Sequence, residues 1–283
     1  MGEAATYGTS VQGRPLLAVT LPGDGPVVLV TAAIHGIEYV GTQVALEILR
    51  AGPLPGATRV VCPVLNPDGY ARTWEQVGEG GVAAMRKNAR GVDLNRNFPL
   101  PWSATPSRLG VAGSDDPAAA TYRGPAPLSE PEASGLAALV QARRPHASAN
   151  LHSFLGTLFA ARVWHPGDWM GYQRLSKAFR AGQGTWPGYR RLGTPLFDVF
   201  TGELEDWQHH VQQCWAVCVE CLSLGESWRQ RALPAPFWRF NPAEPGPLAT
   251  RDAAGVRSLL SAALTLPRPP ARPEAAATRP SWR

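Results

Sequence analysis

Two apolar runs separated by a helical segment constrain the fold of this chain more than any other feature. Residues 26–32 are apolar and β-branched, which predicts a buried strand. Apolar residues at helical spacing follow over residues 41–50, and residues 59–64 predict a second strand. A strand, a crossover helix and another strand indicate parallel pairing within one sheet. We therefore expect a single-domain α/β protein, with three layers (α/β/α) around a mixed, twisted sheet.

The other predicted elements extend this pattern along the chain. Ser129 followed by Glu132 predicts a capping box at the start of a helix that ends near residue 144. The Pro-, Arg- and Ala-rich residues 266–283 predict a disordered tail after one domain over residues 1–265. The remaining elements are, in order, a tight turn at residues 66–69, loop or weak structure over 72–90, a long loop over 99–127, a strand over 147–152, helices over 170–182 and 202–213, and a last strand that holds Glu220.

Charge and composition argue against several functional classes. The net charge is +5, but all of the 27 basic residues except Lys87 and Lys177 are arginine, and no basic stripe interleaved with aromatic residues occurs. We therefore expect no nucleic-acid partner. No apolar stretch approaches the length of a membrane span, and the first residues lack a secretory signal. We expect a cytoplasmic protein with no membrane partner.

Three of the four cysteines lie near one another in the sequence. Cys214, Cys218 and Cys221 are spaced closely enough to suggest a metal cluster. Their surroundings are apolar and instead predict a buried strand, in which thiols act as small hydrophobic groups. Without an export signal, we expect these cysteines and Cys62 to be free thiols.

Two histidines and a glutamate provide the ligands of a catalytic metal site. His35 and Glu38 follow the predicted strand at residues 26–32, and His152 ends the predicted strand at residues 147–152. Ligands of open α/β sheets gather at the carboxyl ends of the strands, so we expect these side chains to meet there. Two imidazole nitrogens and a carboxylate leave one position of a tetrahedral zinc ion open, which is typical of a catalytic site. Each histidine is alternatively a hydrogen-bonded structural residue.

Glu220, Asn95 and Arg96 complete a set of residues that can process a peptide. A carboxylate in an apolar strand is costly without a partner or a task, so Glu220 either has a functional role or is the partner of a core arginine. Asn95 and Arg96 suit a carboxylate, because a guanidinium forms two parallel hydrogen bonds with one. With one zinc ion per chain, this set predicts a peptidase whose substrate is a small peptide with a free C-terminal carboxylate.

The order of these motifs resembles the zinc metallocarboxypeptidase family, the carboxypeptidase A-like clan. The resemblance covers roughly residues 7–240 and is specific because all the motifs occur together. The matching segments are residues 8–14, His35-Gly36-Ile37-Glu38, residues 66–70, Arg86-Lys87-Asn88, residues 91–98, Tyr122-Arg123-Gly124-Pro125, residues 129–132 and Leu151-His152-Ser153.

The resemblance implies a role for each matching residue. His35, Glu38 and His152 would hold zinc, and Glu220 would be the general base. Asp93 would accept the second ring N–H of His35 and fix its orientation; alternatively it is a turn or cap residue. Arg86 would steady the oxyanion beside zinc; alternatively it is a solvated surface arginine. Asn95 and Arg96 would bind the terminal carboxylate of the substrate.

The segment before the last strand is where the resemblance bears on specificity. Glu205 aligns with a pocket residue that reads the last side chain of the substrate, and a carboxylate there favours an ammonium group. Alternatively Glu205 is a solvated residue in the first turn of a helix, where acidic residues favour the dipole. Asp198 falls where digestive members carry a lid tyrosine, and it could contribute to the same pocket. His209 and His210 are expected on a helix surface and are not ligands.

Three functions remain open on this basis. The sequence shows no inhibitory prosegment at its start, and in this it is similar to the bacterial murein peptide amidases of the family. Those enzymes cleave the γ-D-glutamyl bond to diaminopimelate in murein tripeptide. A zinc-dependent deacylase of N-acyl amino acids, as in the aspartoacylase branch, is the alternative enzyme; the Asn66-Pro67-Asp68-Gly69 turn and the residues from Arg86 to Phe98 argue against it. The other alternative is a zinc-bound carboxylate-binding module without turnover, against which Glu220 argues.

Overall fold

One mixed sheet of eight strands forms the centre of the described chain. The computed structural model describes residues 2–76, 78–99, 113–163, 165–184, 188–192, 202–230 and 235–271. The strand order is β1-β2-β4-β3-β5-β8-β6-β7. The strands are β1 (Glu3–Thr9), β2 (Pro15–Leu21), β3 (Val27–Ala32), β4 (Thr58–Cys62), β5 (Ala147–Ser153), β6 (Thr157–Ala160), β7 (Arg190–Leu192) and β8 (Trp215–Cys221).

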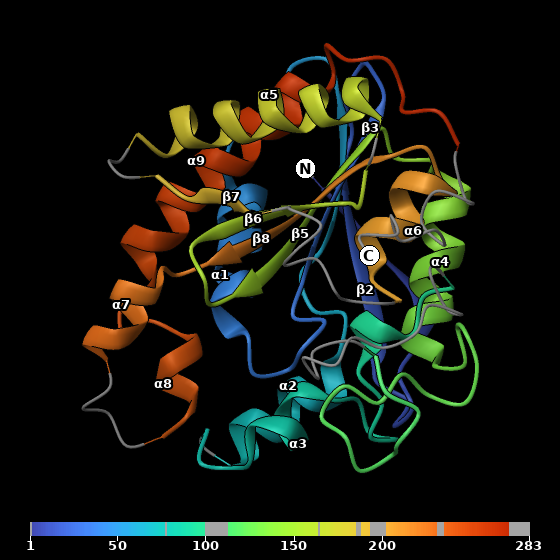
Figure 1. Ribbon diagram of the computed structural model, residues 1–283, viewed down its shortest axis with the longest axis vertical. Coiled ribbons are helices and arrows are strands. Elements are labelled where there is room, and N and C mark those ends of the chain that lie inside the picture. Colours follow the sequence, from blue (N-terminus) through green and yellow to red (C-terminus); the bar gives the residue numbers. More distant parts are fainter. Residues whose placement is uncertain are drawn as a thin grey trace, which may run out of the picture.

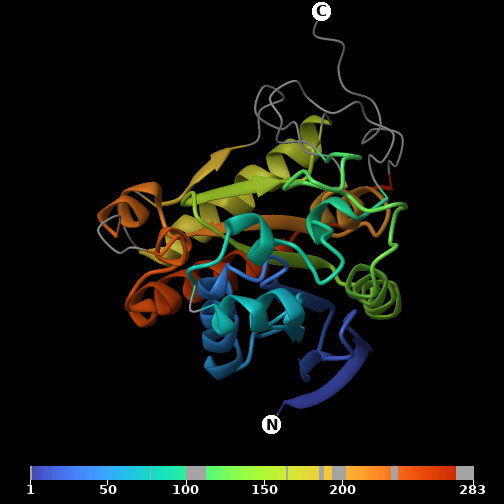
Figure 2. The ribbon, with the colours of Figure 1, turned by 90° about the horizontal axis from the view of Figure 1, so that it is seen from below.

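The four central strands β4, β3, β5 and β8 run parallel, as the crossover helix predicts (Figure 1). The apolar sequence of β3 is buried beyond its first residue, as expected for a strand that helices cover on both faces. The outer pairs β2–β4 and β6–β8 are antiparallel, so the sheet is mixed. The edges formed by β1 and β7 lie on opposite sides of the molecule (Figure 2).

Helices pack on both faces of the sheet and complete the three predicted layers. One core cluster joins α1, α5 and α9 to the sheet, and a second joins α4 and α6 to the other face. In Figure 1, α4 and α6 lie on one side of the sheet and α1 and α9 on the other. The helices are α1 (Tyr39–Arg50), α2 (Pro67–Glu75), α3 (Val82–Arg86), the 3₁₀ helix η1 (Leu94–Arg96), α4 (Pro131–Arg143), α5 (Pro166–Gln183), α6 (Leu204–His210), α7 (Leu224–Arg229), α8 (Phe237–Phe240) and α9 (Pro245–Ala263).

The segment predicted as a turn followed by weak structure contains two helices. Asn66 is the N-cap of α2, because its side-chain oxygen accepts a hydrogen bond from the backbone N–H of Gly69. Pro67 occupies the first helical turn, where its missing N–H costs nothing. The Asn-Pro sequence therefore begins a helix here instead of ending a strand with a tight turn, and the short α3 follows it.

The predicted capping box of α4 is wrong. The N-cap is Glu130, with no side-chain cap hydrogen bond, and Pro131 begins the helix. Glu132 instead accepts hydrogen bonds from the backbone N–H of Val11 and from the side chain of Asn88. Glu132 therefore ties the turn after β1 to the segment that precedes the functional site.

The fold continues past the predicted domain boundary at residue 265. The indole of Trp215 donates a hydrogen bond to the carbonyl of Pro267, and Arg268 donates to the carbonyls of Arg144 and Pro145. Residues 267 and 268 thus contact the domain, the predicted boundary stays a prediction, and residues 272–283 lie outside the described residues. None of the described helices is long and apolar enough to cross a membrane. The cytoplasmic location stays a prediction.

Candidate active site

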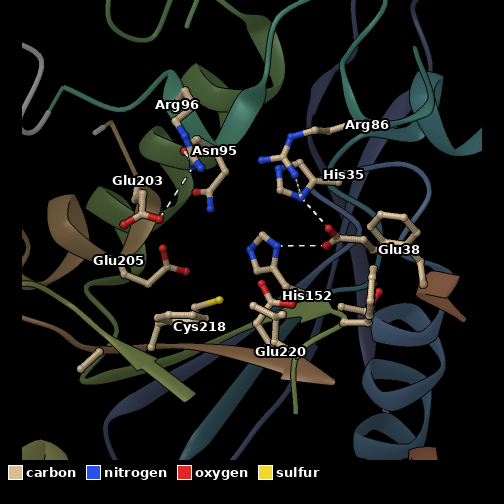
Figure 3. Close-up of a pocket in the computed structure, with 16 residues that line it drawn as sticks. His35, Glu38, Arg86, Asn95, Arg96, His152, Glu203, Glu205, Cys218 and Glu220 are labelled. Atoms are coloured by element: carbon tan, nitrogen blue, oxygen red, sulfur yellow. Dashed lines mark hydrogen bonds and ion pairs between the residues drawn. The ribbon is translucent and has the colours of Figure 1, made fainter. Parts of the chain in front are cut away.

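The three predicted metal ligands meet at the carboxyl edge of the sheet (Figure 3). His35 and Glu38 lie between β3 and α1, and His152 lies near the end of β5. The Nδ1 atom of His35 lies 2.8 Å from Oε1 of Glu38, and Nδ1 of His152 lies 3.0 Å from Oε2. All three side chains are buried, and their ligand atoms lie within 4.8 Å of one another. Two nitrogens and a carboxylate facing one point fit a zinc ion.

The charges around Glu38 keep that ligand ionised. Burial alone would raise its pKa, but His35 and His152 outweigh burial and lower the pKa to about 2. Burial would likewise lower the pKa of His152, and the carboxylate of Glu38 instead raises it to about 9. The carboxylate therefore favours positive charge between the two rings, which a divalent cation can supply.

Asp93 contacts both His35 and Arg86 and orients their side chains. Oδ1 of Asp93 lies 3.1 Å from Nε2 of His35, and Oδ2 accepts a hydrogen bond of 2.8 Å from Nε of Arg86. Burial would raise the pKa of Asp93, but Arg86 and His35 hold it well below its ordinary value. With Nε2 engaged by Asp93, the ring of His35 presents Nδ1 to the metal position, as the resemblance implies.

Glu220 faces the same cavity from β8. It pairs in register with His152 on the neighbouring strand β5, and both residues line the cavity (Figure 3). Burial, followed by repulsion from Glu38, raises the pKa of Glu220. Within the described part of the chain its Oε2 atom has no hydrogen-bond partner. A buried carboxylate with an oxygen left for another group is suited to accept a proton.

Asn95 and Arg96 lie across the cavity from the metal ligands, on η1. Their position follows from Asp93, the N-cap of η1, whose side chain accepts a hydrogen bond from the backbone N–H of Asn95. The side-chain oxygen of Asn95 accepts from the backbone N–H of Leu204, so its NH₂ group remains as a donor toward the cavity. Arg96 lies 3.8 Å from Glu203 through its Nη1 atom. The two amide and guanidinium donors can hold a carboxylate there.

Glu205 lies deep in the wall beneath Asn95 and Arg96. It is 3% exposed, and its Oε1 atom accepts a hydrogen bond of 2.8 Å from Asn150. Asn150 is itself fixed by Thr31 and Ser148. The carboxylate of Glu205 also lies within 4.8 Å of a ring nitrogen of His152 and of the sulfur of Cys218. The solvated first-turn alternative therefore does not describe Glu205; Asp198 lies outside the described residues.

Glu203 and Cys218 are two of the lining residues that the sequence-based set of site residues lacks. Glu203 lies two positions before Glu205, and Cys218 lies two positions before Glu220 on the same face of β8. A period of two along a strand could have indicated Cys218 once Glu220 was placed. For Glu203 the only sequence signal is the repeated acid at spacing two.

The expected surface position of His209 and His210 is wrong, because both side chains are buried. Nδ1 of His209 lies 2.9 Å from the hydroxyl of Tyr172, and Nε2 of His210 lies 2.7 Å from the carbonyl oxygen of Arg162. Neither histidine lines the cavity. Their predicted location is therefore wrong, and the prediction that they are not metal ligands stays a prediction.

The cysteines are free and buried, as predicted. In the described part of the chain Cys214 and Cys221 belong to no group of possible metal ligands, whereas Cys218 lies with His152 and Glu205. That group shares His152 with the first one. Because Nδ1 of His152 faces Glu38, we assign the metal to the group of two histidines and Glu38.

Parallel strands at the centre of the sheet present two histidines and two buried glutamates at one edge, an arrangement typical of metal-dependent hydrolases. The chain belongs to the zinc carboxypeptidase family, whose model matches residues 3–51 and 56–234. The predicted family is therefore confirmed, and with it the expectation of a zinc cofactor.

The curated relatives share the family and match part of the chain. A metallocarboxypeptidase A-like protein of Trichophyton verrucosum is 31% identical over 153 residues, which are 46% of this chain and 33% of the relative. Carboxypeptidase B of Astacus astacus is 27% identical over 150 residues, or 47% of each chain. The matched region thus spans less than half the length of these relatives.

Solved structures support the fold. Carboxypeptidase A of Helicoverpa armigera has a TM-score of 0.74 at 20% identity, covering 93% of this chain and 68% of that one. Murein-tripeptide amidase MpaA of Escherichia coli O157 has a TM-score of 0.54 at 24% identity, covering 78% and 83%. The predicted α/β fold class is confirmed.

Proposed function

We propose that this protein is a zinc-dependent metallocarboxypeptidase, which hydrolyses the amide bond before a C-terminal residue with a free carboxylate. The observation that carries the proposal is the position of Asn95 and Arg96 across one cavity from His35, Glu38 and His152 (Figure 3). Asn95 and Arg96 donate hydrogen bonds to the substrate carboxylate at one end of the cavity, and the metal position lies at the other end. Together they set the distance between the C-terminus of the substrate and the bond that is cleaved.

The residues around the metal position divide the chemistry among them. When bound, zinc supplies a Lewis acid that polarises the carbonyl oxygen and lowers the pKa of water. Glu220 takes a proton from the attacking water and delivers it to the leaving nitrogen. Arg86, aligned by Asp93, offers its guanidinium to the oxygen that becomes negative. Asn95 and Arg96 hold the terminal carboxylate and therefore orient the bond.

The preferred substrate in this proposal ends in a cationic side chain. Glu205 is a buried carboxylate that lines the same cavity as Asn95 and Arg96, so an ammonium group on the last side chain of the substrate can form a charge-assisted hydrogen bond with it. Lysine and diaminopimelate both carry such a group. Murein tripeptide, with its γ-D-glutamyl-diaminopimelate bond, is therefore the first substrate that we propose.

The test is a panel of peptides incubated with the purified, zinc-loaded protein. The panel contains peptides that end in lysine, phenylalanine or alanine with a free carboxylate, and the γ-D-glutamyl-diaminopimelate tripeptide. We expect release of the last residue, loss of release with a chelator, and recovery with added zinc. Absence of hydrolysis across the panel, or hydrolysis that the chelator leaves unchanged, contradicts the proposal.

A further inference from the structure

Glu38 stands at the start of a helix as well as in the metal site. It is the N-cap residue of α1, and an N-cap side chain ordinarily accepts a hydrogen bond from a backbone N–H of the first helical turn. Figure 3 shows its carboxylate directed instead toward His35 and His152, with Oε1 2.8 Å and Oε2 3.0 Å from their Nδ1 atoms. Because both oxygens face the histidines, the helix needs another acceptor.

A side chain from a distant part of the chain supplies this acceptor. Oδ1 of Asn241 accepts a hydrogen bond of 2.8 Å from the backbone N–H of Val40, the second residue of α1. The N–H groups on either side of Val40 donate to nearby backbone carbonyls. Asn241 thus completes the hydrogen bonding of this helix N-terminus from 201 residues away in the sequence.

The amide of Asn241 also contacts the backbone on the other side of Glu38. Its Nδ2 atom donates a hydrogen bond of 2.8 Å to the carbonyl of Ile37, the residue that precedes Glu38. One side chain therefore holds the carbonyl before Glu38 and the N–H of Val40 after it. These two contacts restrict the backbone at Glu38, and the backbone angles determine which directions its side chain can take.

Asn241 is itself completely buried and held in place. Its Nδ2 atom donates a second hydrogen bond, of 3.0 Å, to the carbonyl of Phe237 in α8, and its backbone carbonyl accepts one from the side chain of Gln230. The ring of Phe237 lies in one apolar cluster with Ile37. The segment that carries Glu38 is therefore supported by packing against α8 as well as by the amide.

We propose that Asn241 is a positioning residue of the metal site, which caps α1 in place of Glu38 and so leaves the Glu38 carboxylate to the metal. Because the amide is neutral, it satisfies the N–H of Val40 without adding a charge beside the ligands. Without it, this buried N–H would lose its acceptor, and the N-cap carboxylate of Glu38 would be drawn to it. This role serves the zinc site and is independent of the substrate.

The experiment compares zinc binding by Asn241→Leu and Gln183→Leu. Both replace a buried amide that bridges two segments, but Gln183 donates to Asp252 and accepts from the backbone N–H of Tyr189. We expect the Kd for zinc, measured by competition with a chelating indicator, to rise roughly 10–100-fold in Asn241→Leu. In Gln183→Leu, the matched control, it should stay near that of the wild type. Circular dichroism and denaturant unfolding of the metal-free proteins verify that the variants are folded.

Cobalt in place of zinc provides a spectroscopic readout. The visible absorption of bound Co²⁺ depends on the geometry of its ligands, so Asn241→Leu should change the spectrum and Gln183→Leu should not. Asn241→Ser, in which water can occupy the place of the amide, is the second variant if Asn241→Leu does not fold. A zinc Kd and a cobalt spectrum like those of the wild type in the folded Asn241 variant, or equal changes in Gln183→Leu, overturn the inference. Neither readout requires turnover, so the outcome is separate from that of the peptide panel.

Discussion

The two ends of the active-site cavity differ in how their charged side chains are arranged. At the metal end, Asp93 is engaged by both His35 and Arg86, and Glu38 lies between His35 and His152. At the opposite end, Glu203 lies 3.8 Å from Arg96, and the buried Glu205 accepts a hydrogen bond from Asn150. The metal end is thus preorganised by the protein itself, whereas the opposite end presents donors and carboxylates that line the cavity.

A third buried cluster shows what a structural arrangement of charges looks like. Asp252 accepts hydrogen bonds from Gln183, Tyr189 and Arg251, and Arg251 also pairs with Glu226. Each acceptor in this cluster meets a donor from the same chain. The contrast indicates that a buried carboxylate with an oxygen that has no hydrogen-bond partner, as at Glu220, marks function here, while full pairing marks support of the fold.

The largest expected effect is at the metal end. His152→Ala removes one of the three ligands, so zinc content should fall from one ion per chain toward zero and hydrolysis should be lost. Metal analysis of the purified variant measures this, and X-ray absorption on the wild type should give zinc–nitrogen distances of about 2.0–2.1 Å. His210→Ala, a histidine outside the cavity, is the matched control. Full zinc occupancy in His152→Ala overturns the ligand assignment.

Glu220→Gln should separate chemistry from metal binding. The amide fits the same space but cannot accept the proton, so turnover should fall by about 10²–10⁴-fold while zinc content and the melting temperature stay near those of the wild type. The measurement is kcat on the best substrate of the panel. A rate near that of the wild type means that Glu220 is a structural residue and that the base lies elsewhere.

Asp252→Ala should lower the stability of the fold and leave catalysis unchanged, which is the reverse of the effect expected for Glu220→Gln. It leaves the donors of Gln183, Tyr189 and Arg251 without their acceptor, and we expect a loss of about 3 kcal/mol in the free energy of unfolding. Burial raises the pKa of Asp252, so the uncharged Asp252→Asn should lose less. Denaturant unfolding measures both variants. Since the cluster is structural, kcat/KM of the folded variants should match the wild type; a selective loss of activity contradicts the contrast drawn above.

The parts of the molecule that could be predicted from the sequence are those whose signals are local. An apolar β-branched run followed by His35 indicates both the strand and the position of the ligand, and Glu220 stands out because its neighbours in the strand are apolar. Parallel pairing then brings these strand ends together, so the metal end follows from short segments and one topological rule.

The wrong predictions concern residues whose contacts are with residues distant in the sequence. Glu132 fits a capping box by its spacing from Ser129, but Asn88 and Val11 recruit it for tertiary contacts. His209 is polar and suits a helix surface, yet Tyr172, from another helix, gives it a buried partner. The pair of Glu203 with Arg96 likewise joins separate elements. Periodicity contains no information on such partners, because it describes one element at a time.

The most direct test of the account is the effect of the substrate's terminal charge on wild type and on Arg96→Ala. The same peptide is presented with a free C-terminal carboxylate and with a C-terminal amide. For the wild type, kcat/KM should fall by roughly 10–100-fold on amidation, since charge-assisted hydrogen bonds to the carboxylate are lost. Arg96→Ala should lose a similar factor on the free acid and show almost no further loss on the amide. Equal wild-type activity on the two peptides would mean that the protein does not read a free C-terminus, and would contradict the central claim.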